Sequence, residues 1–111
     1  MKVKMSPNIA IRTKSPQKTF EFYTQVLGFR HRPANKTHVD IDANPLNLFI
    51  IHDDEISGPV MELFVDDLEQ ARSTLTKQGC TVLRWKGKVQ DCYIRDPYGV
   101  IFNLWEADDV S

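Results

Sequence analysis

The chain carries two similar runs of alternating apolar and polar residues, each followed by a helical segment and a glycine. Residues 8–13 form the first run, and the helical stretch after it ends at Gly28; residues 60–65 form the second, and its helical stretch ends at Gly79. The two runs start 52 residues apart and the two glycines lie 51 residues apart. A strand–helix unit that is repeated once, with strand-like segments after each copy, predicts a pseudo-symmetric fold with its site between the two halves.

The first copy predicts one helix and three further strands. Ser15 suits the N-cap of the helix and Pro16 suits its first position. Gly28 stands where a left-handed C-cap is expected. The three strands are expected near residues 29–33, 37–42 and 46–52.

The second copy repeats this order with clearer local signals. Asp67 is the expected N-cap of the second helix, with Gln70 as its capping-box partner. Residues 96–99, Asp-Pro-Tyr-Gly, have the composition of a β-turn. The strands of this copy are expected near residues 81–85, 89–95 and 100–106.

These patterns predict an α+β fold of two βαβββ modules. The modules are expected over residues 7–53 and 59–106, within one domain that spans residues 1–111. A chain of this length is too short for two independent domains of ordinary size.

Composition and charge narrow the range of partners. The chain has 14 basic and 15 acidic residues, scattered along its length, so neither a nucleic acid nor a membrane surface is an expected partner. The longest apolar run covers only residues 48–51, and the N-terminal residues lack the apolar core of a signal peptide. A cytoplasmic location follows as the expectation. Cys80 and Cys92 lack C-x-x-C spacing and are expected to be buried, reduced thiols.

Alternation along the strands assigns side chains to two faces. One face is apolar, with Ile9 and Ile11 in the first run and Leu63 and Val65 in the second, and is expected to lie under a helix. The other face mixes aromatic and apolar side chains with amide, guanidinium and carboxylate groups, which suits a ligand cup. The predicted ligand-binding residues are Asn8, Arg12, Asn47, Phe49, Glu62, Tyr93, Arg95, Asn103 and Trp105.

The charged members of this set have structural alternatives. Glu62 is either bound to Arg12 or Arg95 in a salt bridge, or contacts the ligand or acts as a general base. The two arginines form either a solvated rim or a clamp for an anionic group.

The uncharged members have alternatives as well. Asn8 and Asn103 either bind the ligand or bind each other. Phe49, Tyr93 and Trp105 either pack in the ordinary way or form a stacking wall for a flat organic molecule.

Several other residues receive a structural interpretation. His31, His38 and His52 share no metal-ligand spacing and are expected near solvent at strand ends. Trp85 is expected at the cup rim or in a dimer contact, and Glu106 at the surface end of its strand.

Motifs in a fixed order resemble a known superfamily. They are Phe22-Tyr23 followed by Leu27-Gly28-Phe29, then residues 65–68, then residues 96–99 leading into residues 103–106. Over residues 7–106 this pattern resembles the vicinal oxygen chelate superfamily, which includes glyoxalase I, ring-cleaving dioxygenases, fosfomycin-resistance thiol transferases and bleomycin-resistance proteins. The resemblance implies paired βαβββ modules whose strands curl into an open cup, usually in dimers, so a homodimer is expected.

The resemblance also locates the positions of the superfamily's metal ligands. Catalytic members hold a divalent metal with His, Gln or Glu side chains, and the corresponding positions here are Asn8, Val60 and Asn103. Zn²⁺, Fe²⁺ and Mn²⁺ prefer imidazole nitrogens and anionic oxygens, and Val60 has no donor atom. The prediction is therefore no metal ligand and no cofactor, with a divalent metal held by other residues left open.

Two functions of different kinds follow. The first is a metal-free small-molecule-binding protein of the bleomycin-resistance type, whose partner is an amphipathic organic molecule. The second is a lyase, isomerase or dioxygenase related to glyoxalase I, which uses a metal held by atypical ligands or acid–base chemistry of Glu62 and Tyr93. A structural or regulatory interaction domain is the third alternative.

Overall fold

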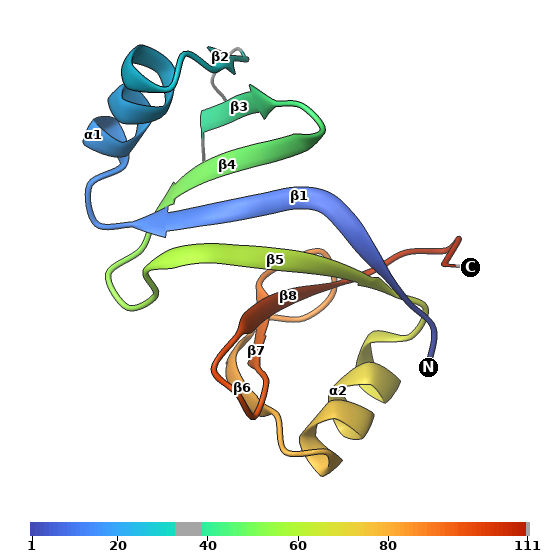
Figure 1. Ribbon diagram of the computed structural model, residues 1–111. Helices are drawn as coiled ribbons and strands as arrows, with labels where there is room; N and C mark the ends of the chain where they lie inside the picture. The colour runs from blue at the N-terminus through green and yellow to red at the C-terminus, as the bar shows by residue number, and fades with distance from the viewer. Residues whose placement is uncertain (33–38, 111) are drawn as a thin grey trace. The chain divides into compact units, whose positions relative to one another are not determined.

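The computed structural model describes residues 1–32 and 39–110 and confirms the two βαβββ modules (Figure 1). The first module has five elements and a π-helical turn: β1 (Val3–Thr13), α1 (Pro16–Glu21), η1 (Phe22–Val26), β2 (Arg30–His31), β3 (Val39–Ala43) and β4 (Leu46–His52). The second has β5 (Gly58–Val65), α2 (Leu68–Lys77), β6 (Thr81–Trp85), β7 (Cys92–Arg95) and β8 (Ile101–Glu106).

The chain divides into two compact units. The first unit is Pro7–Val60, and the second consists of Met1–Ser6 together with Met61–Ser111. Residues 1–6 therefore belong to the second unit, although they precede the first unit in sequence. Two hydrogen bonds join them to it: Lys2 N donates to the side-chain oxygen Asp66 Oδ1 at 3.0 Å, and Asp66 N donates to Lys2 O at 3.4 Å.

The first unit is a mixed sheet in the order β2-β3-β4-β1, with α1 packed on one face. β1 and β4 are parallel, while β2 and β4 each pair with β3 in the antiparallel sense. The buried residues Ile41, Leu48 and Ile50 form its core, and Ile9, Ile11, Phe20 and Tyr23 pack against them. The expected apolar face of this sheet is thus confirmed.

The second unit repeats this arrangement in the order β5-β8-β7-β6, with α2 on its apolar face. β5 and β8 are parallel, and the other two pairs are antiparallel. Its core consists of six buried residues against which Leu63 and Leu75 pack: Val65, Leu68, Ala71, Cys92, Ile94 and Leu104.

The helix ends follow the predicted signals. Asp67 Oδ1 accepts from Gln70 N at 3.0 Å, and Gly28 and Gly79 have φ of +78° and +99°. Ser15 is the N-cap of α1 and Pro16 follows it, as predicted, although the cap is made by the carbonyl oxygen of Ser15, which accepts from Thr19 N at 3.0 Å, and not by its side chain. The predicted first helix also ends differently: its last turn is π-type, closed by Leu27 N donating to Phe22 O at 3.1 Å.

Two strand predictions also need correction. The strand expected at 89–95 begins at Cys92, because residues 86–91 form a turn in which Lys86 N donates to Asp91 O at 2.8 Å. The first strand begins at Val3 rather than at residue 8. Part of the strand expected at 37–42, and His38, lie outside the described residues.

Trp85 lies on the α2 side of its sheet, so the cup-rim alternative predicted for it is wrong, while the dimer contact stays a prediction. A β-bulge between Val82 and Arg84 shifts the alternation by one residue and pairs Trp85 with Cys92. The indole packs against the core of the second unit, with the Arg72 guanidinium 4.8 Å from the ring centroid.

Candidate functional site

In the first unit, the sheet face opposite α1 carries all four residues predicted for it. The parallel register sets Asn8 beside Asn47, Ala10 beside Phe49 and Arg12 beside Ile51. Asn47 Nδ2 donates to Asn8 Oδ1 at 3.0 Å, so these two amides are joined to one another. The antiparallel register adds Asp40 opposite Phe49 and Asp42 opposite Asn47.

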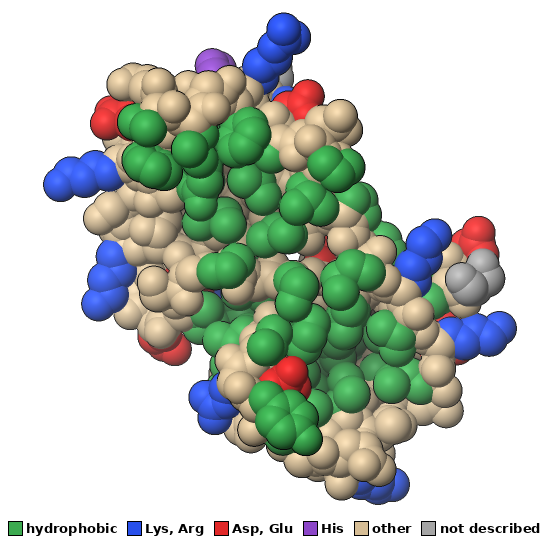
Figure 2. Space-filling model, in the orientation of Figure 1, with side chains coloured by type: hydrophobic (Ala, Val, Ile, Leu, Met, Phe, Trp, Pro, Cys, Tyr) green, Lys and Arg blue, Asp and Glu red, His purple; other side chains and the backbone are tan. Residues whose placement is uncertain are grey.

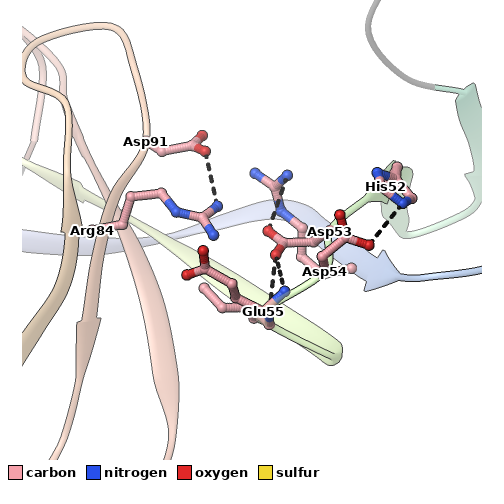
Figure 3. A network of polar contacts seen from close by, with 8 residues as sticks. His52, Asp53, Asp54, Glu55, Arg84 and Asp91 are labelled. Atoms are coloured by element: carbon pink, nitrogen blue, oxygen red, sulfur yellow. Dashed lines mark hydrogen bonds and ion pairs between the residues drawn. The ribbon is translucent and has the colours of Figure 1, made fainter.

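Arg12 forms a buried ion pair at the end of β1. Its Nη1 lies 3.7 Å from Asp53 Oδ2, and the two side chains are only 8% and 4% exposed. The other carboxylate oxygen of Asp53 accepts from the backbone N–H groups of Glu55 and Ile56, both at 2.9 Å (Figure 3). The pair therefore anchors the residues that connect β4 to β5.

A cleft of about 450 Å³ lies beside this ion pair. Residues 13–15 line one wall and residues 53–57 line the other. Next to it, His52 Nε2 lies 3.2 Å from Asp54 Oδ1, and both side chains are largely exposed (Figure 3). The lining is polar and charged, in contrast to the mixed aromatic and polar sheet face.

In the second unit, the face opposite α2 carries the other five predicted residues. Asn103 on β8 lies between Glu62 on β5 and Tyr93 on β7. Trp105 pairs with Phe64, and Arg95 pairs with Ile101 at an exposed position. Asn103 Oδ1 accepts from Cys92 N at 2.9 Å.

Arg84 covers Tyr93, which is 1% exposed. The guanidinium carbon lies 5.3 Å from the centroid of the phenol ring, and Arg84 Nη1 lies 3.4 Å from Asp91 Oδ2 (Figure 3). This stacking uses a face of the ring that a ligand would otherwise contact. Phe49 and Trp105, both half-buried, are the more accessible aromatic residues of the predicted set.

The donor set at the superfamily's metal positions does not fit a divalent metal. Val60 is 1% exposed and has no donor atom. The amide oxygens of Asn8 and Asn103 each accept a hydrogen bond from the protein. Within residues 1–32 and 39–110, no three His, Cys, Asp or Glu side chains are grouped so that they could hold a metal ion.

The described histidines lie at the surface, and Glu106 is bound to other groups of the protein. His31 and His52 are exposed, as expected, and His38 lies outside the described residues. Glu106 Oε2 accepts from Leu68 N at the start of α2, at 2.9 Å, and Lys88 Nζ lies 3.0 Å from Glu106 Oε1. The hydrogen bond from Leu68, followed by that from Lys88, lowers the pKa of Glu106.

The two cysteines are free thiols, as expected. Cys92 is fully buried, and Cys80 is partly buried. Burial raises the pKa of both thiols. Their chemistry is therefore that of small core residues.

Sequence reasoning missed the carboxylates that pair with the arginines. Asp53 and Asp91 both lie in segments that connect strands, where residue alternation gives no information about side-chain direction. Asp40, which lies opposite Phe49, was also missed, because its strand was predicted without an assignment to a face. The acidic run at 53–55 was visible in the sequence, but its contact with Arg12 depends on a turn that composition alone does not specify.

The comparisons with known proteins agree with this architecture. A family model described as "Glyoxalase-like domain" matches residues 8–105. The chain therefore belongs to the glyoxalase-like domain family, within the vicinal oxygen chelate superfamily. No curated protein matches the sequence.

Solved structures share the fold at low sequence identity. A hypothetical protein from Bacillus halodurans C-125 has a TM-score of 0.66 at 13% identity, over 98% of this chain and 97% of its own. A glyoxalase/bleomycin resistance protein/dioxygenase superfamily member from Vibrio splendidus 12B01 has a TM-score of 0.65 at 13% identity, over 95% and 99%. A variant of homoprotocatechuate 2,3-dioxygenase from B. fuscum has a TM-score of 0.60 at 16% identity, over 93% of this chain but 32% of its own.

These likenesses confirm the predicted α+β fold of the glyoxalase/bleomycin-resistance type. Among the described residues, neither helix is long and apolar enough to cross a bilayer.

Proposed function

We propose that this chain is a cytoplasmic, metal-free protein that binds an amphipathic organic molecule through the polar and aromatic faces of its two modules. One observation carries the proposal: the positions of the superfamily's metal ligands hold two hydrogen-bonded amides and a valine, while the faces around them keep aromatic and polar side chains. Binding needs no Lewis acid, so a sequestering protein functions without a metal, whereas the chelate chemistry of the superfamily requires one.

The first test is native mass spectrometry on protein purified without a metal-binding tag, before and after dialysis against a chelator. We expect no stoichiometric divalent ion and a retained fold. One tightly held ion per wild-type chain would overturn the proposal and favour the enzyme.

A ligand screen tests the binding itself. A molecule that binds only the folded state raises its stability by RT ln(1 + [L]/Kd), so thermal shifts report binding directly. We expect the shift to be unchanged by a chelator and to be weakened by Phe49→Ala. The matched control is Phe102→Ala on β8, which removes the same half-buried group from the α2 side of the second sheet.

The proposal includes a homodimer. Phe22, Val26, Leu27 and Phe29, at the end of the first helical segment, are 51%, 68%, 48% and 37% exposed, which is a large apolar surface for so small a unit. Figure 2 shows hydrophobic side chains gathered over the unit that contains α1 and also over the unit that contains α2. A second copy that covers this patch would remove it from water.

Native mass spectrometry also tests the dimer. Val26→Glu is expected to give monomer, while Gln25→Glu, an exposed neighbour given the same charge, is expected to leave the dimer intact. A wild-type monomer at micromolar concentration would refute this part of the proposal.

A further inference from the structure

The cleft beside the Arg12–Asp53 pair has no role in the proposed function. Its volume of about 450 Å³ falls within the usual range of small-molecule sites. All of its lining residues belong to the first unit, so the cleft is complete within that unit. It lies where the parallel strands β1 and β4 both end, which is the position at which open α/β sheets bind their ligands.

Hydrogen bonds to backbone groups hold both walls of the cleft. Asp53 N donates to Thr13 O at 3.0 Å and so joins the two walls. On the first wall, Ser15 N donates to Thr13 Oγ1 at 3.0 Å. On the second, Asp53 Oδ1 accepts from Glu55 N and Ile56 N, both at 2.9 Å. The cleft is therefore formed before a ligand arrives, which lowers the entropy cost of binding.

The two walls carry opposite charges that do not neutralise each other. Lys14 is the charged residue of the first wall, and Asp54 and Glu55 are exposed acidic residues of the second. Within residues 1–32 and 39–110, neither Lys14 nor Glu55 takes part in an ion pair. The other carboxylate of the lining, that of Asp53, is paired with Arg12. A ligand therefore meets a cation on one wall and carboxylates on the other.

The uncharged part of the lining consists mainly of hydroxyl groups. Ser15 and Ser57 supply one on each wall, and the Ser15 side chain does not cap α1. Among the lining residues that the structure describes, none is aromatic, and the apolar residue, Ile56, is buried. Hydroxyl groups both donate and accept hydrogen bonds, so this lining suits a small polar molecule rather than a flat aromatic one.

We propose that the cleft binds a small zwitterion with one ammonium and one carboxylate group, such as an α-amino acid. The carboxylate of the ligand lies against Lys14 and its ammonium group lies against Glu55, so each charge meets its opposite. A simple anion or cation is attracted by one wall and repelled by the other. The cleft shares no lining residue with the predicted ligand-binding set, so this site and the proposed function can fail independently.

Three probes separate the contributions of the two charges. L-2-aminobutyrate carries both groups, butyrate lacks the ammonium group, and propylamine lacks the carboxylate. Their Kd values are measured at constant pH by NMR titration of the backbone amides of Ser15 and Ser57. We expect a millimolar Kd for L-2-aminobutyrate, about tenfold tighter than for either ion. Because salt screens exposed charges, this Kd should rise several-fold between about 0.01 and 1 M NaCl.

Two variants test the two walls separately. Lys14→Met removes the ammonium group but keeps an unbranched side chain, and Glu55→Gln removes the charge but keeps the shape. Each should weaken binding of L-2-aminobutyrate about fivefold, the upper range for an exposed ion pair. Both positions are exposed, so the variants should fold, which circular dichroism checks. Lys18→Met and Glu21→Gln, exposed positions of α1 outside the lining, are the matched controls and should leave the Kd unchanged.

Several outcomes would overturn the proposal. One is tighter binding of butyrate or propylamine than of L-2-aminobutyrate. Another is a Kd that Lys14→Met and Glu55→Gln change no more than their controls do. Shifts confined to amides outside residues 13–15 and 53–57, or no saturable shift with any probe, would refute the site as well and would leave the proposed function of the sheet faces untouched.

Discussion

The buried ion pair between Arg12 and Asp53 predicts an unusually costly substitution at Asp53. Two unit charges 3.7 Å apart interact by about 4.5 kcal/mol at an effective dielectric constant of 20, and breaking one side of a buried pair typically costs about 3–5 kcal/mol. Asp53→Asn removes the charge but keeps an oxygen for the N–H groups of Glu55 and Ile56. We expect it to lower the free energy of unfolding by about 2–3 kcal/mol, and Asp53→Ala by about 3–5 kcal/mol, since alanine also removes the acceptor.

The chain contains a matched exposed pair for comparison. Arg72 Nη1 and Glu69 Oε2 are also 3.7 Å apart, but their side chains are 44% and 71% exposed. Exposed pairs contribute little, so Glu69→Gln should cost less than about 0.5 kcal/mol. The same distance and the same charges therefore predict two different results, and burial is the cause of the difference.

Urea unfolding followed by far-UV circular dichroism measures these free energies. Hydrogen exchange at the amides of Glu55 and Ile56 should accelerate in Asp53→Ala before global unfolding, because both amides lose their acceptor. A double-mutant cycle with Arg12→Met gives the coupling between the two side chains. If Asp53→Asn costs no more than Glu69→Gln, Arg12 is not held by Asp53 in the way that its burial indicates.

Three further predictions concern the second unit. The pKa of Glu106 is lower in the folded state than in the unfolded state, so its contribution to the free energy of unfolding is present above the unfolded pKa and is lost as pH falls through the folded pKa. The loss of stability caused by Glu106→Gln, measured by urea titration, should therefore become smaller towards acid pH, and a loss that does not change with pH would contradict this. The fully buried Cys92 thiol, studied in a Cys80→Ser background, should react with Ellman's reagent only at the rate of unfolding, and fast reaction in the native state would contradict its burial. Val89 has φ of +58°, a conformation costly for a β-branched residue, so Val89→Gly should raise the free energy of unfolding by about 1 kcal/mol, and a loss would show that no strain is relieved.

Residue alternation predicted the sheet faces well wherever the strands are regular. Asn8, Arg12, Asn47 and Phe49 share a face because β1 and β4 run in register without a bulge. Alternation does not hold along β6, since one extra residue between Val82 and Arg84 reverses it before Trp85 and nothing in the local composition marks this bulge.

The candidate site was predicted less completely than the fold. Its members were assigned from the strands, but Asp53 and Asp91, whose carboxylates pair with Arg12 and Arg84, come from the segments between strands. Those contacts depend on tertiary turns, such as the one in which Asp53 Oδ1 accepts two backbone N–H groups. Sequence reasoning therefore predicted the positions of the polar side chains better than it predicted the ion pairs and hydrogen bonds that they form.

The placement of residues 1–6 in the second unit has a consequence for the order of events during synthesis. These residues leave the ribosome before the whole of the first unit, yet Lys2 finds its partner only when Asp66 has followed. The first unit is made in one uninterrupted stretch, Pro7–Val60, and can complete its hydrogen bonds earlier. The start of β1 therefore cannot form its hydrogen bonds with the second unit until more than half of the chain has been made, and its backbone groups stay solvated until then.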